Sequence, residues 1–291
     1  MVCGQLYDIG TAVVLWNDPN GYDAYRTDKR FAPPEQSAWT PGSGLATPNR
    51  YGERRIDDDP ELHERVGAQG WTVELLRRKV DQFVIHYDAA GTSRACFRTL
   101  HDVRGLSIHF MIDIDGTIYQ TLDVKERAWH ATVVNDRSVG VELANIGAFP
   151  PAAAAALDRW YARDAGGAVI SPPPDVGGGG VRSGGPFRPA RPGPIVGTIQ
   201  GQTLEMQDFT REQYAALVKL TSALCTILAI PCDYPRDEQG HLVTGVLPPD
   251  RLASYRGLLG HFHVQQNKVD PGPAFEWDRV VDDSRRRMGR P

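Results

Sequence analysis

Residues 83–87 read Phe-Val-Ile-His-Tyr, and this run decides how the chain is expected to fold. A short, continuous apolar run of this length predicts a buried β-strand. A second run at 138–143 predicts another buried strand, which ends at Ala144 and Asn145. Because a sheet restrains the backbone of its strands, His86 at the end of the first run is well held for metal binding.

Residues 108–122 carry the clearest hairpin signal, because two runs rich in β-branched residues flank Asp115-Gly116. An Asp-Gly pair tolerates the positive φ angles of a tight two-residue turn. A last short strand is predicted at 258–261.

Helical patterns lie between the strand runs. Thr92 or Ser93 can cap one helix, and Thr210 with Gln213 has the form of a capping box at the start of another. The predicted helices cover 74–80, 92–102 and 210–228. Strands that alternate with helices indicate an α/β fold with a single mixed central β-sheet flanked by helices.

The chain divides into two parts of different character. Residues 1–80 are predicted to form a partly irregular N-terminal extension with a short strand at 13–16 and a loop at 32–49. Residues 81–291 are predicted to form the main domain. It contains a Pro/Gly-rich insertion at about 150–205 that is expected to lack regular structure, apart from a possible helix at 152–163.

Composition excludes several classes of protein. The 291 residues are 41% hydrophobic and 23% charged, as in soluble globular proteins, and the net charge of -4 gives no reason to expect nucleic-acid binding. No apolar stretch reaches 18 residues, so no membrane span is expected. No signal peptide is recognised, which fits a cytoplasmic protein, one released from the cell by other means or one exported by an unrecognised route. The four scattered cysteines are expected to be reduced thiols.

Three residues far apart in the sequence could hold a metal ion. His86, His261 and Asp270 offer two imidazoles and one carboxylate, which can bind Zn²⁺ and leave its fourth position open for water. That ligand number is typical of catalytic zinc sites. Lys268 would place a positive charge beside the ion, where an oxyanion could develop. The pattern predicts a hydrolase.

Six short motifs carry a family resemblance. They lie at 83–87, 107–110, 115–120, 128–131, 138–142 and 260–272. In this order they resemble the zinc-dependent N-acetylmuramoyl-L-alanine amidases of the amidase-2 family, which share their fold with peptidoglycan recognition proteins. The resemblance covers about 82–146 and 205–280. It implies cleavage of the amide between N-acetylmuramic acid and the stem-peptide L-alanine, in peptidoglycan or muropeptides.

The resemblance also implies roles for individual residues. His86, His261 and Asp270 match the zinc ligands, Glu142 matches the general base, and Lys268 matches the residue that stabilises the tetrahedral intermediate. A carboxylate such as Glu142 in an apolar strand needs a partner or a raised pKa, which agrees with the catalytic assignment.

Residues beside the expected zinc site are assigned to the substrate groove. His130 matches a residue that lines the groove in the family, and Trp129 and Tyr87 are expected to form groove walls or core. His109 is either a groove residue or a structural hydrogen-bonding residue. His263 is a rival ligand, because both histidines of a strand at 261–263 would face the same side.

One alternative function and one point of local geometry stay open. Some relatives keep the groove but lose the zinc, so a non-catalytic peptidoglycan-binding module is the main rival to the enzyme. The interval between His261 and Asp270 is about one residue shorter than in family members with a carboxylate ligand, which leaves the local loop geometry open.

Overall fold

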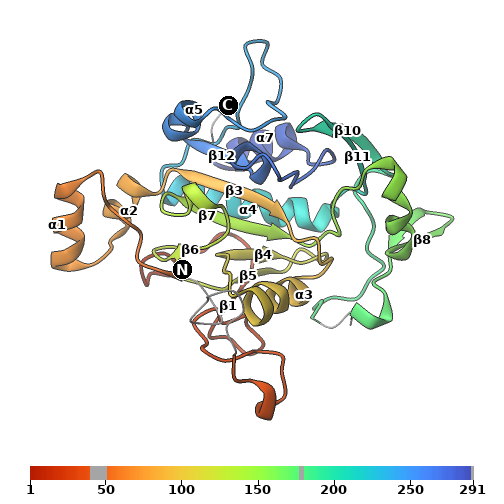
Figure 1. The fold of residues 1–291 in the computed structure, drawn as a ribbon, viewed down its shortest axis with the longest axis horizontal. Helices are drawn as coiled ribbons and strands as arrows, with labels where there is room; N and C mark the ends of the chain where they lie inside the picture. The colour runs from red at the N-terminus through yellow and green to blue at the C-terminus, as the bar shows by residue number, and fades with distance from the viewer. Residues whose placement is uncertain (40–50, 177–179, 290–291) are drawn as a thin grey trace.

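The computed structural model describes residues 1–39, 51–176 and 180–289. A six-stranded mixed sheet lies at its centre, in the order β1-β5-β4-β7-β3-β12 (Figure 1). Its strands are β1 (Val13–Leu15), β3 (Gln82–Tyr87), β4 (Phe110–Ile112), β5 (Ile118–Gln120), β7 (Ser138–Leu143) and β12 (Gly257–Gly260). Within this sheet β4, β7, β3 and β12 run parallel, β1 is parallel to β5, and β4 is antiparallel to β5. The predicted α/β architecture is confirmed.

The two faces of the sheet pack against different layers. Phe83 and Ile85 of β3 belong to the main hydrophobic cluster with helices α4 (Arg211–Ile227) and α7 (Trp277–Arg287). Val84 points to the other face and packs in a separate cluster, since successive side chains of a strand alternate. Figure 1 shows α4 behind the sheet. His86 therefore lies on the face opposite α4.

The predicted helices are found with small shifts at their ends. Helix α4 begins with a complete capping box: Thr210 Oγ1 accepts a hydrogen bond from Gln213 N at 3.0 Å, and Gln213 Oε1 accepts one from Thr210 N at 2.9 Å. Helix α3 (Ser93–Phe97) is capped by Thr92 and continues as a π-helical turn at Arg98–Arg104. The other helices are α1 (Pro60–Gln69), α2 (Val73–Lys79), α5 (Pro249–Ser254) and α6 (His261–Val264).

The β4–β5 hairpin is confirmed, but its turn has three residues rather than the predicted two. Asp113 N donates a hydrogen bond to Thr117 O at 3.0 Å, which leaves Ile114, Asp115 and Gly116 in the loop. Gly116 has a φ of +78°. A glycine in the left-handed region at the third position is the usual way to close a three-residue hairpin loop.

The insertion at 150–205 is more regular than predicted. Two antiparallel hairpins form within or at its end, and the predicted helix at 152–163 is a 3-10 segment, Pro151–Arg159. The hairpins pair β8 (Tyr161–Asp164) with β9 (Gly167–Ile170), and β10 (Ile195–Ile199) with β11 (Gln202–Met206). The prediction failed because the prolines lie outside the four strands and leave strand-length intervals between them.

The predicted N-terminal extension contributes directly to the sheet. Strand β1 pairs with β5 in the central sheet, whereas β2 (Tyr51–Gly52) pairs with β6 (Arg127–Ala128) in a separate two-stranded sheet. Residues 40–49 of the predicted loop lie outside the described residues, and Pro34–Gln36 forms a 3-10 turn. The boundary at residue 80 stays a prediction.

Cys3 and Cys96 are free thiols. Among the described residues, no helix has the length and apolar character needed to cross a membrane.

Asp113, which directly precedes the turn of the β4–β5 hairpin, makes the free energy of unfolding depend on pH. Burial raises the pKa of its carboxyl to about 7, so the folded chain binds a proton there that the unfolded chain releases near pH 4. The free energy of unfolding of wild type, relative to Asp113→Asn, should fall as the pH rises from about 4 to about 7 and level off above. Urea titrations across this range measure the difference. A difference that does not change with pH would contradict the assignment.

Candidate metal centre

His86, His261 and Asp270 converge on one point although they lie far apart in the sequence. His86 Nδ1 is 3.0 Å from His261 Nδ1 and 2.9 Å from Asp270 Oδ2, and His261 Nδ1 is 3.0 Å from the same carboxylate oxygen. All three side chains are buried. Two atoms bound about 2.0 Å from a tetrahedral zinc ion lie about 3.3 Å apart, so the three donors are spaced closely enough to share one ion.

The sheet brings these residues together. Strands β3 and β12 are parallel neighbours in which Gly260 pairs with Ile85, so His86 and His261 each follow one of these paired residues. Asp270 returns to the same place because Phe262 N donates a hydrogen bond to Asp270 O at 3.2 Å. The predicted strand at 258–261 is wrong at its last residue, since His261 starts helix α6.

Hydrogen bonds at the outer ring nitrogens orient both imidazoles. His86 Nε2 lies 3.0 Å from His130 Nδ1, and His261 Nε2 lies 2.6 Å from Gln265 Oε1. If both Nε2 atoms carry the proton, both Nδ1 atoms present lone pairs to the point shared with Asp270 Oδ2. Three acceptors with no proton between them are a suitable environment for a cation, and such outer hydrogen bonds are typical of metal ligands.

A cavity of about 280 Å³ opens beside the three residues. Glu142, Lys268, His130, Trp129 and Tyr87 line it together with all three candidate ligands. Glu142 pairs with His86 across β7 and β3, so the two side chains leave the same face of the sheet. Its Oε2 atom is buried and has no hydrogen-bond partner among the described residues.

Burial and charge shift the pKa values at this centre in opposite directions. Burial, reinforced by the charge of His261, lowers the pKa of His86 to about 4. Burial also raises the pKa of Glu142 well above its usual range, and the charge of Asp270 adds to this effect. Burial raises the pKa of Asp270, but the charges and hydrogen bonds of His261 and His86 outweigh this effect and hold the pKa below its usual range. The site therefore favours a neutral His86 imidazole beside an ionised Asp270 carboxylate.

Because Gly140 has no side chain, it leaves space for the ring of His130, which contacts His86. A Cβ atom at Gly140 would lie 2.6 Å from Cε1 and Nδ1 of His130 and 2.5 Å from Cδ1 of Ile108. His130 Nε2 lies 3.2 Å from Ser138 Oγ, so both of its ring nitrogens have partners. Burial, followed by the charge of His86, lowers the pKa of His130 well below its usual value.

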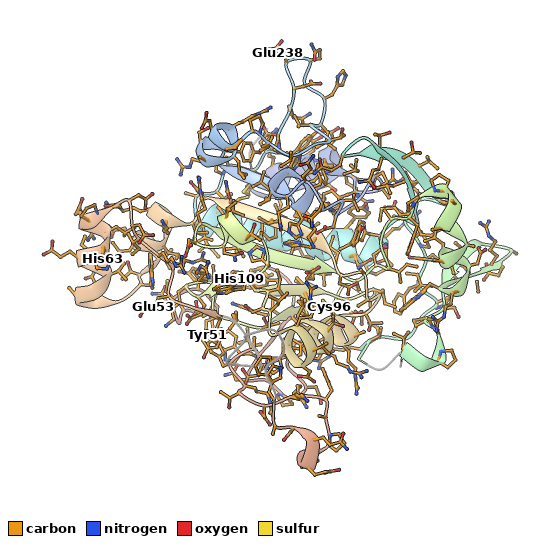
Figure 2. All side chains as sticks on the ribbon, in the orientation of Figure 1. Tyr51, Glu53, His63, Cys96, His109 and Glu238 are labelled. Atoms are coloured by element: carbon orange, nitrogen blue, oxygen red, sulfur yellow. The ribbon has the colours of Figure 1, made fainter. Side chains whose placement is uncertain are left out.

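His109 does not line this cavity. It is fully buried, and its ring lies 5.9 Å from that of His130. His109 Nδ1 accepts a hydrogen bond from Gly140 N at 3.2 Å, and its Nε2 lies 2.9 Å from Glu126 O. Figure 2 shows it within the body of the molecule. The structure thus favours the structural alternative for His109 over the groove.

His263 is not part of the donor cluster. Because α6 replaces the expected strand, His263 and His261 do not face the same side. His263 Nδ1 accepts a hydrogen bond from Gly260 N at 2.9 Å, and its Nε2 lies 2.7 Å from Val243 O. His101 is also outside the donor cluster: it is buried, and its Nδ1 atom lies 2.7 Å from Asp102 Oδ1.

Some residues of the site escaped the interpretation of the sequence. Gln265 lies one helical turn after His261, and this spacing would have drawn attention to it if 261–264 had been predicted as a helix. Asp88, Cys96 and Arg104 also line the cavity. Nothing in their local sequence distinguishes them from ordinary loop and helix residues.

The comparisons with known proteins agree with the motifs. Residues 76–176 match the family model described as N-acetylmuramoyl-L-alanine amidase. The resemblance to this family is confirmed. The matched segment contains His86, His130 and Glu142, whereas His261, Lys268 and Asp270 lie beyond it. No curated protein matches the chain.

Solved structures of amidases are similar to parts of the chain. The E. coli amidase AmiD, in complex with the substrate anhydro-N-acetylmuramic acid-L-Ala-D-γ-Glu-L-Lys, is 19% identical with a TM-score of 0.38, over 70% of this chain and 57% of that one. An AmpD derivative is 19% identical with a TM-score of 0.34, over 71% and 86%. The endolysin LysCS from Clostridium intestinale is 15% identical with a TM-score of 0.37, over 74% and 88%. Scores this low support no inference about function.

The close contact at Gly140 gives a direct test of the site's packing. Gly140→Ala should force the His130 ring or Ile108 to move, and should lower the free energy of unfolding by about 1–3 kcal/mol. Gly184→Ala is the control, because a Cβ atom at Gly184 meets nothing within 4 Å. Urea denaturation compares the two, and equal effects would show that Gly140 is not needed for this packing.

Proposed function

We propose that the protein is a zinc-dependent N-acetylmuramoyl-L-alanine amidase. It would hydrolyse the amide between N-acetylmuramic acid and L-alanine in peptidoglycan or its fragments. The observation that carries this proposal is the convergence of His86, His261 and Asp270, with about 3.0 Å between donor atoms, at a cavity that also contains Glu142 and Lys268. The family match over 76–176 supports the choice of reaction and substrate.

The ligand set suits zinc. Neutral imidazole nitrogens and a carboxylate oxygen are ligands that Zn²⁺ accepts, and three protein ligands leave a position for catalysis. When bound, zinc supplies Lewis-acid chemistry and lowers the pKa of water at the site to about 7.

Glu142 is suited to move protons. Its raised pKa, caused first by burial, makes the carboxylate a stronger base than an exposed glutamate. In the proposed reaction Glu142 takes a proton from the attacking water and returns it to the nitrogen of the leaving L-alanine. Because Oε2 has no partner among the described residues, no hydrogen bond must break before the transfer.

Lys268 supplies positive charge to the lining of the cavity. It has no ion pair among the described residues, and its charge acts on both His86 and Glu142. In the proposed reaction its ammonium group stabilises the oxyanion that forms as water adds to the carbonyl. His130 does not act on the substrate in this scheme, because both of its ring nitrogens already have protein partners.

The substrate is assigned as a class only. The cavity holds the aromatic side chains Tyr87 and Trp129 beside the polar groups, which suits a ligand with both sugar and peptide parts. Where in the cell the protein acts, as a cytoplasmic enzyme or as a released lysin, stays a prediction from the sequence.

The role of Glu142 can be tested without disturbing the metal ligands. Glu142→Gln should keep bound zinc and reduce hydrolysis of a soluble muropeptide about 10²–10⁴-fold, since the amide cannot accept the proton. Release of the free stem peptide, followed by chromatography, measures the rate. Glu238→Gln, at the tip of a surface loop in Figure 2, is the control and should have wild-type activity.

A Glu142→Gln variant with full activity would remove the proposed base. A wild-type protein that binds zinc and muropeptide but releases no product would instead favour the non-catalytic binding module.

A further inference from the structure

Arg54 is a buried cation that forms no ion pair with a carboxylate of the described residues. It is 3% exposed, yet it comes from the predicted N-terminal extension. Its Nη1 atom donates to the backbone carbonyls of Asn135, Asp136 and Ser138 at 3.1, 3.1 and 3.0 Å, and Nη2 donates to that of Val124 at 2.8 Å. A buried charge needs such partners to offset its loss of hydration. These bonds fix the backbone at two places that are well separated in sequence.

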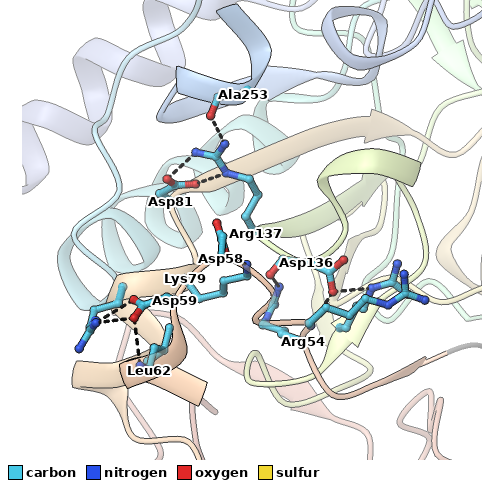
Figure 3. Close-up of polar contacts among 12 residues, drawn as sticks. Arg54, Asp58, Asp59, Leu62, Lys79, Asp81, Asp136, Arg137 and Ala253 are labelled. Carbon is cyan, nitrogen blue, oxygen red and sulfur yellow. Dashed lines mark hydrogen bonds and ion pairs between the residues drawn. The ribbon is translucent and has the colours of Figure 1, made fainter. Parts of the chain in front are cut away.

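Figure 3 shows Arg54 close to Asp136. The four carbonyls bracket the segment that carries His130. Side chains of the same segment also form hydrogen bonds with His130. Asn135 Oδ1 accepts hydrogen bonds from His130 N at 3.1 Å and from Ala131 N at 2.7 Å. Ser138 Oγ lies 3.2 Å from His130 Nε2. Two residues whose carbonyls Arg54 holds are therefore the two whose side chains position His130.

His130 in turn contacts a candidate metal ligand. Its Nδ1 atom lies 3.0 Å from Nε2 of His86, and His86 points its other nitrogen at His261 and Asp270. The partner of the outer nitrogen of a ligating histidine fixes the ring's orientation and tautomer. A continuous chain of hydrogen bonds thus runs from Arg54 through Asn135 and Ser138 to His130 and His86.

We infer that Arg54 is a positioning residue of the metal centre, which acts on His86 through His130. The inference rests on the proposed function only in its assumption that the centre binds zinc. A lysine cannot replace Arg54, because a single ammonium has three donors and lacks the planar fork that reaches carbonyls on both sides of the segment. Arg54 would therefore influence metal binding without touching the metal, the substrate or any ligand.

The alternative is that Arg54 only stabilises the fold. Zinc affinity separates the two roles, provided that it is measured on folded protein. Val280→Ala is a control matched for stability: Val280 is fully buried in α7, in the core on the face of the sheet opposite the metal centre. This variant should lower the unfolding midpoint and leave zinc affinity unchanged.

The experiment is a double-mutant cycle on the full chain. Zinc affinity is measured by competition with a chromophoric chelator for wild type, Arg54→Lys, His130→Ala and the double variant, at a temperature where circular dichroism shows all four folded. Arg54→Lys should weaken zinc binding about 10-fold, at the lower end of the range for outer hydrogen-bond partners of ligands. In the His130→Ala background it should have little further effect. Arg54→Gln is run in parallel, so that a second folded variant is available.

Two results would overturn the inference. One is wild-type zinc affinity in a folded Arg54 variant. The other is a double variant whose fold-loss of zinc affinity equals the product of the fold-losses of the two single variants. Muropeptide hydrolysis by wild type is assayed separately. Its absence, with zinc binding and the coupling intact, would contradict the proposed function but not the role of Arg54.

Discussion

The structure depends on holding three hydrogen-bond acceptors against one another in a buried place. Nδ1 of His86, Nδ1 of His261 and Oδ2 of Asp270 lie about 3.0 Å apart. When the outer nitrogens of both rings carry the protons, nothing at the centre offsets the repulsion of three lone pairs. Such an arrangement is costly unless a cation is shared. The surrounding fold must therefore supply enough rigidity to maintain it.

Two layers of the molecule supply this rigidity. The parallel pair β3–β12 sets His86 and His261 side by side, and the packing of α4 and α7 on the opposite face holds the sheet in place. The loop segment 124–138 then fixes the outer side of His86 through His130. Gly140 leaves the space that His130 requires. The register of β3 and β12 sets the backbone positions of His86 and His261. Their ring orientations are set by hydrogen bonds to His130 and Gln265, respectively.

Much of this arrangement could be predicted from the sequence. The apolar runs at 83–87 and 138–143 and the capping box at Thr210 are local signals, because hydrophobic pattern and capping depend on neighbours in the chain. The candidate ligands were found because histidines and a carboxylate in a family-like order are distinctive. The convergence of these residues follows from sheet register, which the local pattern does not give.

The features that were missed are those set by tertiary packing. His261 was placed in a strand because Leu258 to His261 looks apolar, whereas the chain turns into α6 as soon as it leaves the sheet. The hairpins in the insertion were missed because the high proline and glycine content of the whole segment was taken to exclude regular structure throughout it. Arg54 gave no signal at all: an arginine in a polar stretch is usually exposed, and only the folded structure shows the carbonyls that surround it.

The central claim is that one zinc ion is shared by His86, His261 and Asp270. The most direct test is the zinc content of the purified chain, measured by inductively coupled plasma mass spectrometry after dialysis against a weak chelator. The account predicts one zinc per wild-type chain and almost none in Asp270→Ala. A wild-type chain that fails to retain zinc after reconstitution, or an Asp270→Ala chain that retains it fully, would contradict the account.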